Sequence, residues 1–313
     1  MASANFSVLH AGPHVSVQDG GRPGLARFGV TGSGAMDRSS LKFANAALGN
    51  PLGASGIEIS IGGLTLKCTE GSVTFAVAGG GFIVTIDDVA LPSWCVATIH
   101  AGSVLTIRPG SWGSWAYLAF VGDLQCGAWL GSASTHGSSG FGGGMIAARH
   151  VIGVDNSKVI TRREGVIPFP PRQELRSFVR VILGPQDRFF DAQAISDFQS
   201  RPFTLTNAYD RMGVRLDGPR LGVTAALNMP SEAIVRGSIQ VAGDGVATVL
   251  LADHQTTGGY PKIATVLSDD LDGFAQLRSR ASVKFRAVEP QYAIAATRAR
   301  RQTLGDYIKS LIG

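Results

Sequence analysis

Residues 73–86 read VTFAVAGGGFIVTI, in which two alternating apolar runs flank three glycines. Successive side chains of a β-strand point to opposite faces, so apolar residues at every second position give a strand one buried face. The glycines favour a turn between two such strands. The alternating apolar residues are Val73, Phe75, Val77, Phe82, Val84 and Ile86. This stretch therefore predicts two strands, one on each side of the glycines.

The same alternation recurs on both sides of this stretch. Turn residues separate the runs, for example at Pro109-Gly110 and Gly122-Asp123. Many short strands divided by turn residues are typical of a β-barrel or β-sandwich, so a mainly β fold is predicted. The further predicted strands carry Ile57, Ile59, Ile61, Leu105, Ile107, Trp115, Tyr117, Ala119, Val179, Val181, Phe203, Leu205, Val214, Leu216, Ile239, Val241, Val249, Leu251, Val283 and Phe285.

Residues 161–177, TRREGVIPFPPRQELRS, are rich in proline and charge, and they divide the strands into two series. A domain usually has about 100–200 residues, so a chain of 313 residues suits two domains. The sequence predicts an N-terminal β domain at 1–165, a C-terminal β domain at 174–288, each a barrel or a sandwich, and a C-terminal helix at 289–313.

Only a few short helices are expected besides the C-terminal one. Asp37 is a candidate N-cap for a helix that Gly49 ends, because Asp accepts hydrogen bonds from a helix N-terminus and Gly suits its C-terminus. Ser268 is a candidate N-cap for a second helix. A third is predicted by the apolar stripe of Phe190, Ala194 and Phe198.

The composition is that of a globular protein, since 44% of the residues are hydrophobic and 16% are charged. The net charge of +5 is spread thinly and gives no basis for binding nucleic acid. No segment approaches about 18 uninterrupted apolar residues, and the N-terminus lacks the pattern of a signal peptide. Neither a membrane span nor secretion is expected.

The three cysteines, Cys68, Cys95 and Cys126, lie far apart and lack the spacing of a metal site. An odd count argues against a closed disulfide framework. We expect reduced thiols in a cytoplasmic protein, and no metal ion.

Glycine-rich polar sequence at residues 17–37 interrupts the strand pattern. It includes Arg22 and leads through Ser33 and Gly34 to the helix expected at Asp37. A loop that enters a helix presents free backbone N–H groups, which suit a carboxylate, a carbonyl oxygen or a phosphate. A hairpin followed by a capped helix explains the same residues without a ligand, and both interpretations stay open.

Two shorter polar segments lie in the second half. In residues 209–213, YDRMG, Arg211 could reach an anion, although an ordinary surface turn is equally compatible with the sequence. In residues 237–245, GSIQVAGDG, Gln240 lies on the face opposite Ile239 and Val241. Gln240 alone is weak support for a site.

Residues 252–262, ADHQTTGGYPK, are the most informative segment. They follow an apolar strand and combine carboxylate, imidazole, amide, hydroxyl, phenol and ammonium groups with two glycines. A phenol or an amine near a cation can serve in proton transfer or oxyanion stabilisation, so Tyr260 and Lys262 are candidates for these roles.

Several strings together resemble the biotin-dependent carboxyltransferase-like family. These strings are VQDGGRPG, SGAMD, ANAALGNP, GIEI, GSAST, GPQDRF, DRMGVRLDGP, GSIQVAGDG and DHQTTGGYPKIATV, and the resemblance runs from about residue 6 to 287. The family includes the C-type subunit of prokaryotic 5-oxoprolinase, the second-subunit-type domain of allophanate hydrolase and urea amidolyase, and the antagonist of a sporulation histidine-kinase inhibitor. Thr31, Tyr209 and Arg236 depart from the usual residues beside these motifs.

The resemblance implies two tandem cyclophilin-like β-barrel units. It also implies one component of a multi-subunit, ATP-dependent 5-oxoprolinase that converts 5-oxo-L-proline to L-glutamate, together with a B-type partner and an A-type hydrolase. ATP would then be bound with the partner subunits. The family leaves two alternatives, a carboxyltransferase-type subunit that acts on a urea-like substrate and a non-catalytic regulator of a kinase inhibitor. Biotin is not expected on this chain, because no lysine is flanked by methionine.

Motif membership and side-chain chemistry together suggest roles for individual residues. The predicted catalytic residues are Asp37, Asp253, Tyr260 and Lys262. The predicted substrate-binding residues are Arg22, Ser33, Gly34, Arg211, Gln240, Gln255 and Thr257. Among them the cations are expected to hold anionic groups, the acids and the phenol to handle protons, and the remaining polar groups to orient a lactam or urea-like substrate.

Overall fold

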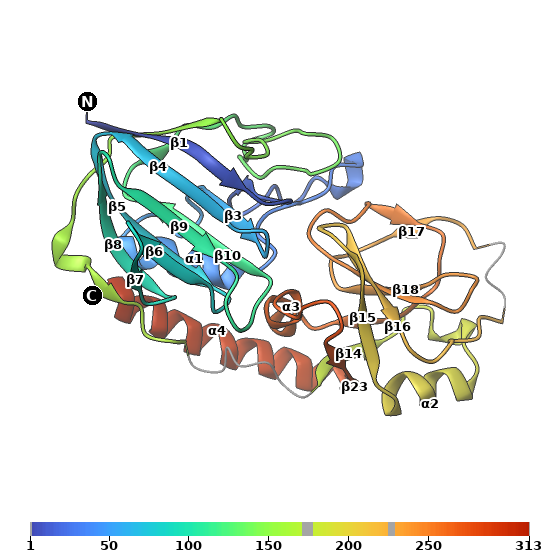
Figure 1. Ribbon diagram of the computed structural model, residues 1–313. Coiled ribbons are helices and arrows are strands. Elements are labelled where there is room, and N and C mark those ends of the chain that lie inside the picture. Colours follow the sequence, from blue (N-terminus) through green and yellow to red (C-terminus); the bar gives the residue numbers. More distant parts are fainter. Residues whose placement is uncertain (1, 171–177, 225–228, 313) are drawn as a thin grey trace. The chain divides into compact units, whose positions relative to one another are not determined.

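Strands provide most of the secondary structure in the computed structural model, which describes residues 2–170, 178–224 and 229–312 (Figure 1). The predicted mainly β fold is confirmed. The chain forms two units: unit 1 comprises Met1–Arg22, Ser33–Arg172 and Leu304–Gly313, and unit 2 comprises Pro23–Gly32 and Gln173–Thr303. Residues 171–177, the last part of the proline-rich stretch at 161–177, lie outside the described residues.

Unit 1 contains a seven-stranded and a six-stranded sheet, in which all the paired strands are antiparallel. The first has the order β11 (Asp123–Leu124), β12 (Val151–Asp155), β1 (Ser3–Ala11), β4 (Leu64–Glu70), β9 (Val104–Arg108), β6 (Ile83–Ile86) and β7 (Val89–Leu91). The second has the order β13 (Gly165–Val166), β8 (Cys95–His100), β5 (Ser72–Gly79), β10 (Trp115–Phe120), β3 (Gly56–Ser60) and β2 (Ser16–Gln18).

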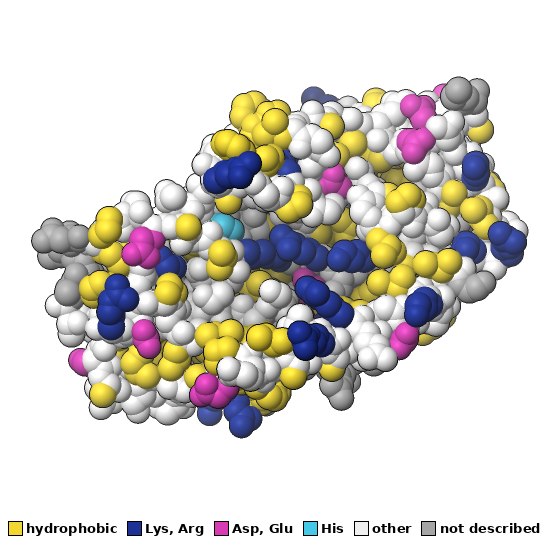
Figure 2. Space-filling view, turned by 180° about the vertical axis from the view of Figure 1, so that it is seen from behind, with side chains coloured by type: hydrophobic (Ala, Val, Ile, Leu, Met, Phe, Trp, Pro, Cys, Tyr) yellow, Lys and Arg dark blue, Asp and Glu magenta, His cyan; other side chains and the backbone are white. Residues whose placement is uncertain are grey.

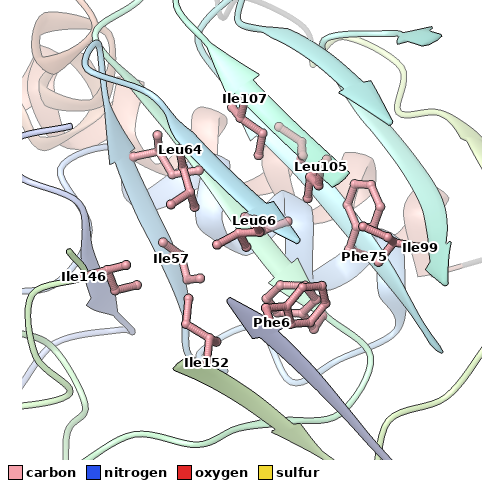
Figure 3. Close-up of a cluster of buried hydrophobic side chains, with 14 of the residues drawn as sticks. Phe6, Ile57, Leu64, Leu66, Phe75, Ile99, Leu105, Ile107, Ile146 and Ile152 are labelled. Carbon is pink, nitrogen blue, oxygen red and sulfur yellow. The ribbon is translucent and has the colours of Figure 1, made fainter. Parts of the chain in front are cut away.

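Both sheets contribute side chains to one hydrophobic core (Figure 3). Phe6 and Leu66 come from the first sheet, whereas Ile57 and Phe75 come from the second. This sharing explains the period-2 pattern, because each strand points every second side chain at the core.

The other face of the six-stranded sheet is covered by α1 (Arg38–Leu48). As predicted, Asp37 caps this helix and Gly49 ends it with a φ of 77°. Every residue of β3 and β10 is consequently buried. The expectation of a single buried face is wrong for these two strands, because helix and core cover opposite sides of the sheet.

The predicted C-terminal helix is confirmed as α4 (Pro290–Ile312). Near its end, Tyr307 packs edge-on against Phe43 of α1, with ring centroids 4.8 Å apart. Arg163 donates hydrogen bonds to the carbonyl oxygens of Ala47, Leu311 and Ile312. A cation therefore satisfies terminal carbonyls of both helices, where the helix dipole favours positive charge.

Unit 2 contains an eight-stranded sheet. Its order is β22 (Ser282–Val283), β15 (Phe203–Tyr209), β16 (Gly213–Asp217), β19 (Ala247–Leu250), β18 (Ser238–Val241), β21 (Lys262–Val266), β14 (Val179–Leu183) and β23 (Phe285–Ala287). Only Lys284 separates the first strand of this order from the last, so the sheet is nearly closed into a barrel. Phe198, Phe203 and Phe285 pack against one another in its core, with the rings of Phe198 and Phe285 stacked.

Short elements complete unit 2. They are α2 (Ala192–Ser200), α3 (Ser268–Ala275), and a two-stranded sheet of β17 (Glu232–Ala233) and β20 (Thr257–Gly258). Asp191 caps α2. The prediction that Ser268 is an N-cap is wrong, since α3 begins at Ser268 and its N-cap, Leu267, makes no side-chain cap bond. Asp269 and Asp270 in the first turn place negative charge at that helix end instead. Within the described ranges of both units, short 3-10 helices lie at Ala26–Phe28, Thr161–Arg163 and Asp187–Phe189.

Candidate functional site

The predicted site residues form one group in each unit. Unit 1 holds Arg22, Ser33, Gly34 and Asp37. Unit 2 holds the larger group, which consists of Arg211, Gln240, Asp253, Gln255, Thr257, Tyr260 and Lys262.

In unit 1, Asp19 ties the first glycine-rich loop to the loop at residues 132–134. Its carboxylate accepts hydrogen bonds from the hydroxyls of Ser132 at 2.6 Å and Ser134 at 2.5 Å, and from the backbone N–H of Ala133 at 2.7 Å. Gly34, with a φ of 87°, lies so close that an added Cβ would be 3.2 Å from the nitrogen of Gly21. A side chain there would strain the left-handed backbone and press on the Gly20-Gly21 segment, which explains this glycine.

Arg22 is buried beside the same loop. Its guanidinium donates to the carbonyl oxygens of Trp129 and Ser134 and lies 5.1 Å from the centroid of the Trp129 ring. Arg22 thus holds the main chain of a neighbouring loop. Its predicted contact with a substrate anion stays a prediction.

Asp37 has a structural role as the N-cap of α1. Its carboxylate accepts from the N–H of Ser40 at 3.0 Å and from the hydroxyl of Ser40 at 2.6 Å. Its own N–H donates to Oη of Tyr117 at 2.6 Å. Helix capping is sufficient to explain an aspartate here, and its predicted part in proton transfer stays a prediction.

Two buried residues beside this helix terminus, Glu58 and Tyr117, had no role in the sequence-based site. Oε2 of Glu58 accepts from the N–H of Met36 at 2.6 Å and from the phenol of Tyr117 at 2.9 Å. Burial, and then the nearby carboxylates, raise the pKa of Tyr117 well above its ordinary value, so the phenol stays protonated and donates. The signal in the sequence was the Glu of the GIEI string, a carboxylate within an apolar strand.

Ser33 lies between these two groups of interactions along the chain. It is fully buried with a φ of 48°, a left-handed conformation that is uncommon for serine. Among the described residues its hydroxyl finds no hydrogen-bond partner. Buried polar groups without partners are rare in folded proteins, and Ser33 therefore remains a good candidate for contact with a ligand.

In unit 2, Arg211 and Asp253 form a buried, bidentate ion pair. Nε of Arg211 donates to Oδ2 of Asp253 at 2.9 Å, and Nη2 donates to Oδ1 at the same distance. The carboxylate of Asp253, in the same chain, is thus the anion that Arg211 binds in this structure. Such a pair is strongly coupled, because removing either partner leaves a buried charge without compensation.

Lys262 is also buried but lacks such a partner. Only 2% of the residue is exposed, and Nζ has no hydrogen-bond partner among the residues that the structure describes. Oε2 of Glu232 lies 3.8 Å from Nζ, within ion-pair range but beyond hydrogen-bond distance. The ammonium is therefore a cation with unused donors.

Gln186 connects Lys262 to Glu232. Its Oε1 accepts from the backbone N–H of Lys262 at 2.9 Å, and its Nε2 donates to Oε2 of Glu232. Its own N–H donates to the carbonyl oxygen of Lys262 at 3.2 Å. Neither Gln186 nor Glu232 was a predicted site residue, although Gln186 belongs to the GPQDRF string.

A row of polar residues crosses four strands of unit 2. In the sheet register, Arg215 of β16 is opposite Thr248 of β19, Thr248 is opposite Gln240 of β18, and Gln240 is opposite Lys262 of β21. Residues directly opposite each other in a sheet lie close together, and the register of β18 with β21 shifts between Ile239 and Gln240, so that Lys262 is the residue opposite Gln240. Gln240 and Lys262, predicted separately from two motifs, are therefore neighbours.

A pocket of about 590 Å³ lies over part of this row. The residues that line it are Asn207, Ala208, Tyr209, Asp210, Met212, Gly213, Arg215, Gln240, Ala242, Val246, Thr248, Leu250, Gln255 and Tyr260. Three predicted site residues, Gln240, Gln255 and Tyr260, are thus brought together. Lys262 and Thr257 are not among the lining residues. The volume suits a small organic ligand.

The described residues contain no group of three or more His, Cys, Asp and Glu side chains that could hold a metal ion. No helix within the described ranges is long and apolar enough to cross a membrane. Figure 2 shows one face of the molecule, on which Lys and Arg side chains prevail over Asp and Glu, in keeping with the net charge of +5.

Comparison with known proteins supplies the family context for these residues. The family described as carboxyltransferase domain, subdomain A and B, matches residues 28–287. The chain is 32% identical over 310 residues to the 5-oxoprolinase C subunit of Haemophilus influenzae, covering 98% of each chain. It is 33% identical over 275 residues to the protein of the same name in Escherichia coli, covering 87% of each.

More distant relatives are much longer proteins. Urea amidolyase of Saccharomyces cerevisiae is 27% identical over 326 residues, which are 96% of this chain but 17% of that one. The crystal structure of the Kluyveromyces lactis urea amidolyase superposes with a TM-score of 0.86 at 24% identity, covering 98% of this chain and 20% of that one. This second likeness shows the fold.

Proposed function

Because the chain belongs to the carboxyltransferase domain family, we propose that it is one component of an ATP-dependent 5-oxoprolinase that converts 5-oxo-L-proline to L-glutamate. Two relatives that match over most of their length carry the name of the 5-oxoprolinase C subunit. A subunit works in an assembly, and the proposal includes a B-type partner, an A-type hydrolase, and ATP bound with those partners.

The observation that carries the proposal is the buried ammonium of Lys262, whose donors are unused among the described residues. Opening a lactam at the expense of ATP involves anionic groups on the substrate, the phosphate and the reacting carbonyl. A fixed cation in a site with little water stabilises such groups without the cost of reorganising solvent. Lys262 is the described residue best prepared for that task.

The pocket near Lys262 suits the neutral part of such a substrate. Gln240 and Gln255 each offer an amide that can both donate and accept hydrogen bonds, and Tyr260 adds a phenol. A lactam has one N–H donor and one carbonyl acceptor in the same plane, which such groups can bind together. Small-molecule sites usually combine an apolar wall with a few polar groups of this kind.

A second function has support from the longer relatives. Urea amidolyase matches this chain over nearly its whole length, so a carboxyltransferase-type subunit that acts on urea is the alternative. Carboxybiotin would then be carried by another chain. The two functions differ in substrate, because 5-oxoproline carries a carboxylate and urea does not.

The test is to co-purify the chain with its partner subunits and to measure glutamate formed from 5-oxo-L-proline, with and without ATP, omitting each component in turn. We expect glutamate only when ATP and this chain are both present. Lys262→Met should abolish the activity, whereas Lys284→Met, a change at an exposed lysine of the same unit, should preserve it. Glutamate formation that does not need this chain would contradict the proposal. Absence of glutamate from an assembled complex would also contradict it, and labelled bicarbonate with urea would then be tried.

A further inference from the structure

The burial of the Lys262 ammonium costs free energy of folding. An ammonium has three donors, and a charge that is buried without hydrogen bonds is destabilising. The described structure satisfies none of these donors, although the residue is only 2% exposed. A group with unmet donors in a folded protein calls for an explanation, and a ligand that supplies the acceptors is a direct one.

Glu232 offsets the charge of Lys262 without using its donors. Oε2 of Glu232 is 3.8 Å from Nζ, and the Glu232 side chain is 45% exposed. That same oxygen accepts a hydrogen bond from Nε2 of Gln186. Glu232 is therefore held near the ammonium by Gln186 while its carboxylate keeps contact with solvent.

The position of Glu232 also allows it to leave. It lies in β17, which pairs only with β20 among the described strands, and this two-stranded sheet is separate from the barrel. β20 rests directly on Gln240, since a Cβ added at Gly258 would lie 2.7 Å from Nε2 of Gln240. A half-exposed side chain on a small, separate sheet can change rotamer without disturbing the eight-stranded sheet.

We propose that Nζ of Lys262 is a subsite for a carboxylate of the ligand, and that Glu232 is a resident carboxylate which the ligand displaces. The ligand carboxylate would accept the hydrogen bonds that Glu232 is too distant to accept. Gln186 fixes the backbone of Lys262 and holds Glu232 beside the ammonium until the ligand displaces it. This inference rests on the proposed function for the identity of the ligand, whose carboxylate is that of 5-oxo-L-proline.

This arrangement makes Glu232 a determinant of specificity. A ligand with a carboxylate compensates the charge of Lys262 when Glu232 moves away, whereas a neutral ligand such as urea leaves the ammonium without an anion. Binding of a carboxylate should tighten when the competing charge is removed. We expect Glu232→Gln to lower the Kd for 5-oxo-L-proline about fivefold, and Lys262→Met to raise it at least about tenfold.

Calorimetric titration of the full chain, alone and co-purified with its partners, tests these effects. The ligands are 5-oxo-L-proline, 2-pyrrolidinone, which is the same lactam without the carboxylate, and inorganic phosphate. The matched control variants change exposed residues of unit 2: Glu289→Gln for the acid and Lys284→Met for the lysine. We expect the two site variants to shift 5-oxo-L-proline binding in opposite directions, while both controls and all binding of 2-pyrrolidinone stay unchanged.

The other outcomes overturn the inference. The first is that 5-oxo-L-proline binds to no form of the protein. The second is that Glu232→Gln binds 5-oxo-L-proline more weakly than the wild type does. The third is that the two site variants change the Kd of 2-pyrrolidinone as much as that of 5-oxo-L-proline. Phosphate binding that depends on Lys262, with no such dependence for 5-oxo-L-proline, would assign the subsite to a phosphate and not a carboxylate. If glutamate forms as proposed but binding fails these criteria, only the subsite is wrong. If binding meets the criteria and no glutamate forms, the proposed function is wrong and the subsite stands.

Discussion

Replacing Lys262 by methionine should make the protein more stable. Methionine keeps a long, flexible stem and removes the ammonium, whose donors are unused among the described residues. Most substitutions of buried residues are destabilising, so an increase in stability is an unusual and informative result. It would show that the chain retains this charge at a cost to its own folding.

The magnitude follows from two opposing contributions. Burying an ion costs several kcal/mol even after relaxation. The attraction between Nζ and a carboxylate oxygen 3.8 Å away offsets part of this cost, by about 1–4 kcal/mol at the dielectric values of water and of a protein surface. Because the Glu232 side chain is 45% exposed, the smaller figure applies. The Lys262→Met variant should therefore gain about 1–3 kcal/mol in free energy of unfolding.

The assay must report on unit 2. All four tryptophans, at positions 94, 112, 115 and 129, belong to unit 1, so intrinsic fluorescence follows the wrong unit. Hydrogen exchange measured by mass spectrometry in increasing urea can follow peptides from β18 and β21 directly. Lys284→Met is the control and should change the stability by less than about 0.5 kcal/mol. A loss of more than about 1 kcal/mol in Lys262→Met would refute the reasoning, because it would mean that the ammonium is already compensated.

Three further predictions use other sites. Arg211→Met should cost about 3–5 kcal/mol in unit 2, as it leaves the buried carboxylate of Asp253 alone; a change below about 1 kcal/mol in urea-dependent exchange would contradict this. Asp37→Ala should cost about 1–2 kcal/mol in unit 1, measured by tryptophan fluorescence in urea, while Asp37→Asn should keep the cap and most of the stability. An activity loss in the stable Asn variant would then indicate a catalytic carboxylate. Burial raises the pKa of Cys95 to about 12, so at pH 8 this thiol should react with iodoacetamide far more slowly in the folded protein than in urea; equal rates would show that it is accessible.

Alternating apolar residues predicted the strands of both units because that pattern depends only on neighbours in the chain. Asp37 and Gly49 were predicted as helix ends for the same reason, since capping is a local interaction. The buried position of Glu58 was not predictable from this pattern. Its strand alternates like a half-exposed one, and only the helix packed over the sheet shows that both faces are covered.

The arrangement of side chains around Lys262 could not be predicted from the spacing of residues in the sequence. Three separate segments of the chain supply Gln186, Glu232 and Lys262. Gln186 and Glu232 are 46 positions apart, and no short motif contains more than one of the three residues. The strand register brings Gln240 opposite Lys262, and that register is a property of the folded sheet. Family resemblance pointed to Lys262, but only the fold shows that its ammonium is buried with unused donors.

The most direct test of the account is the rate of glutamate formation from 5-oxo-L-proline by the assembled subunits with ATP, compared between the wild-type chain and its Lys262→Met variant in complexes of equal composition. The account predicts that the wild-type complex forms glutamate and that the variant complex, although it assembles and is at least as stable, forms almost none. A variant complex that forms glutamate at the wild-type rate would contradict the claim that the buried ammonium of Lys262 serves the reaction.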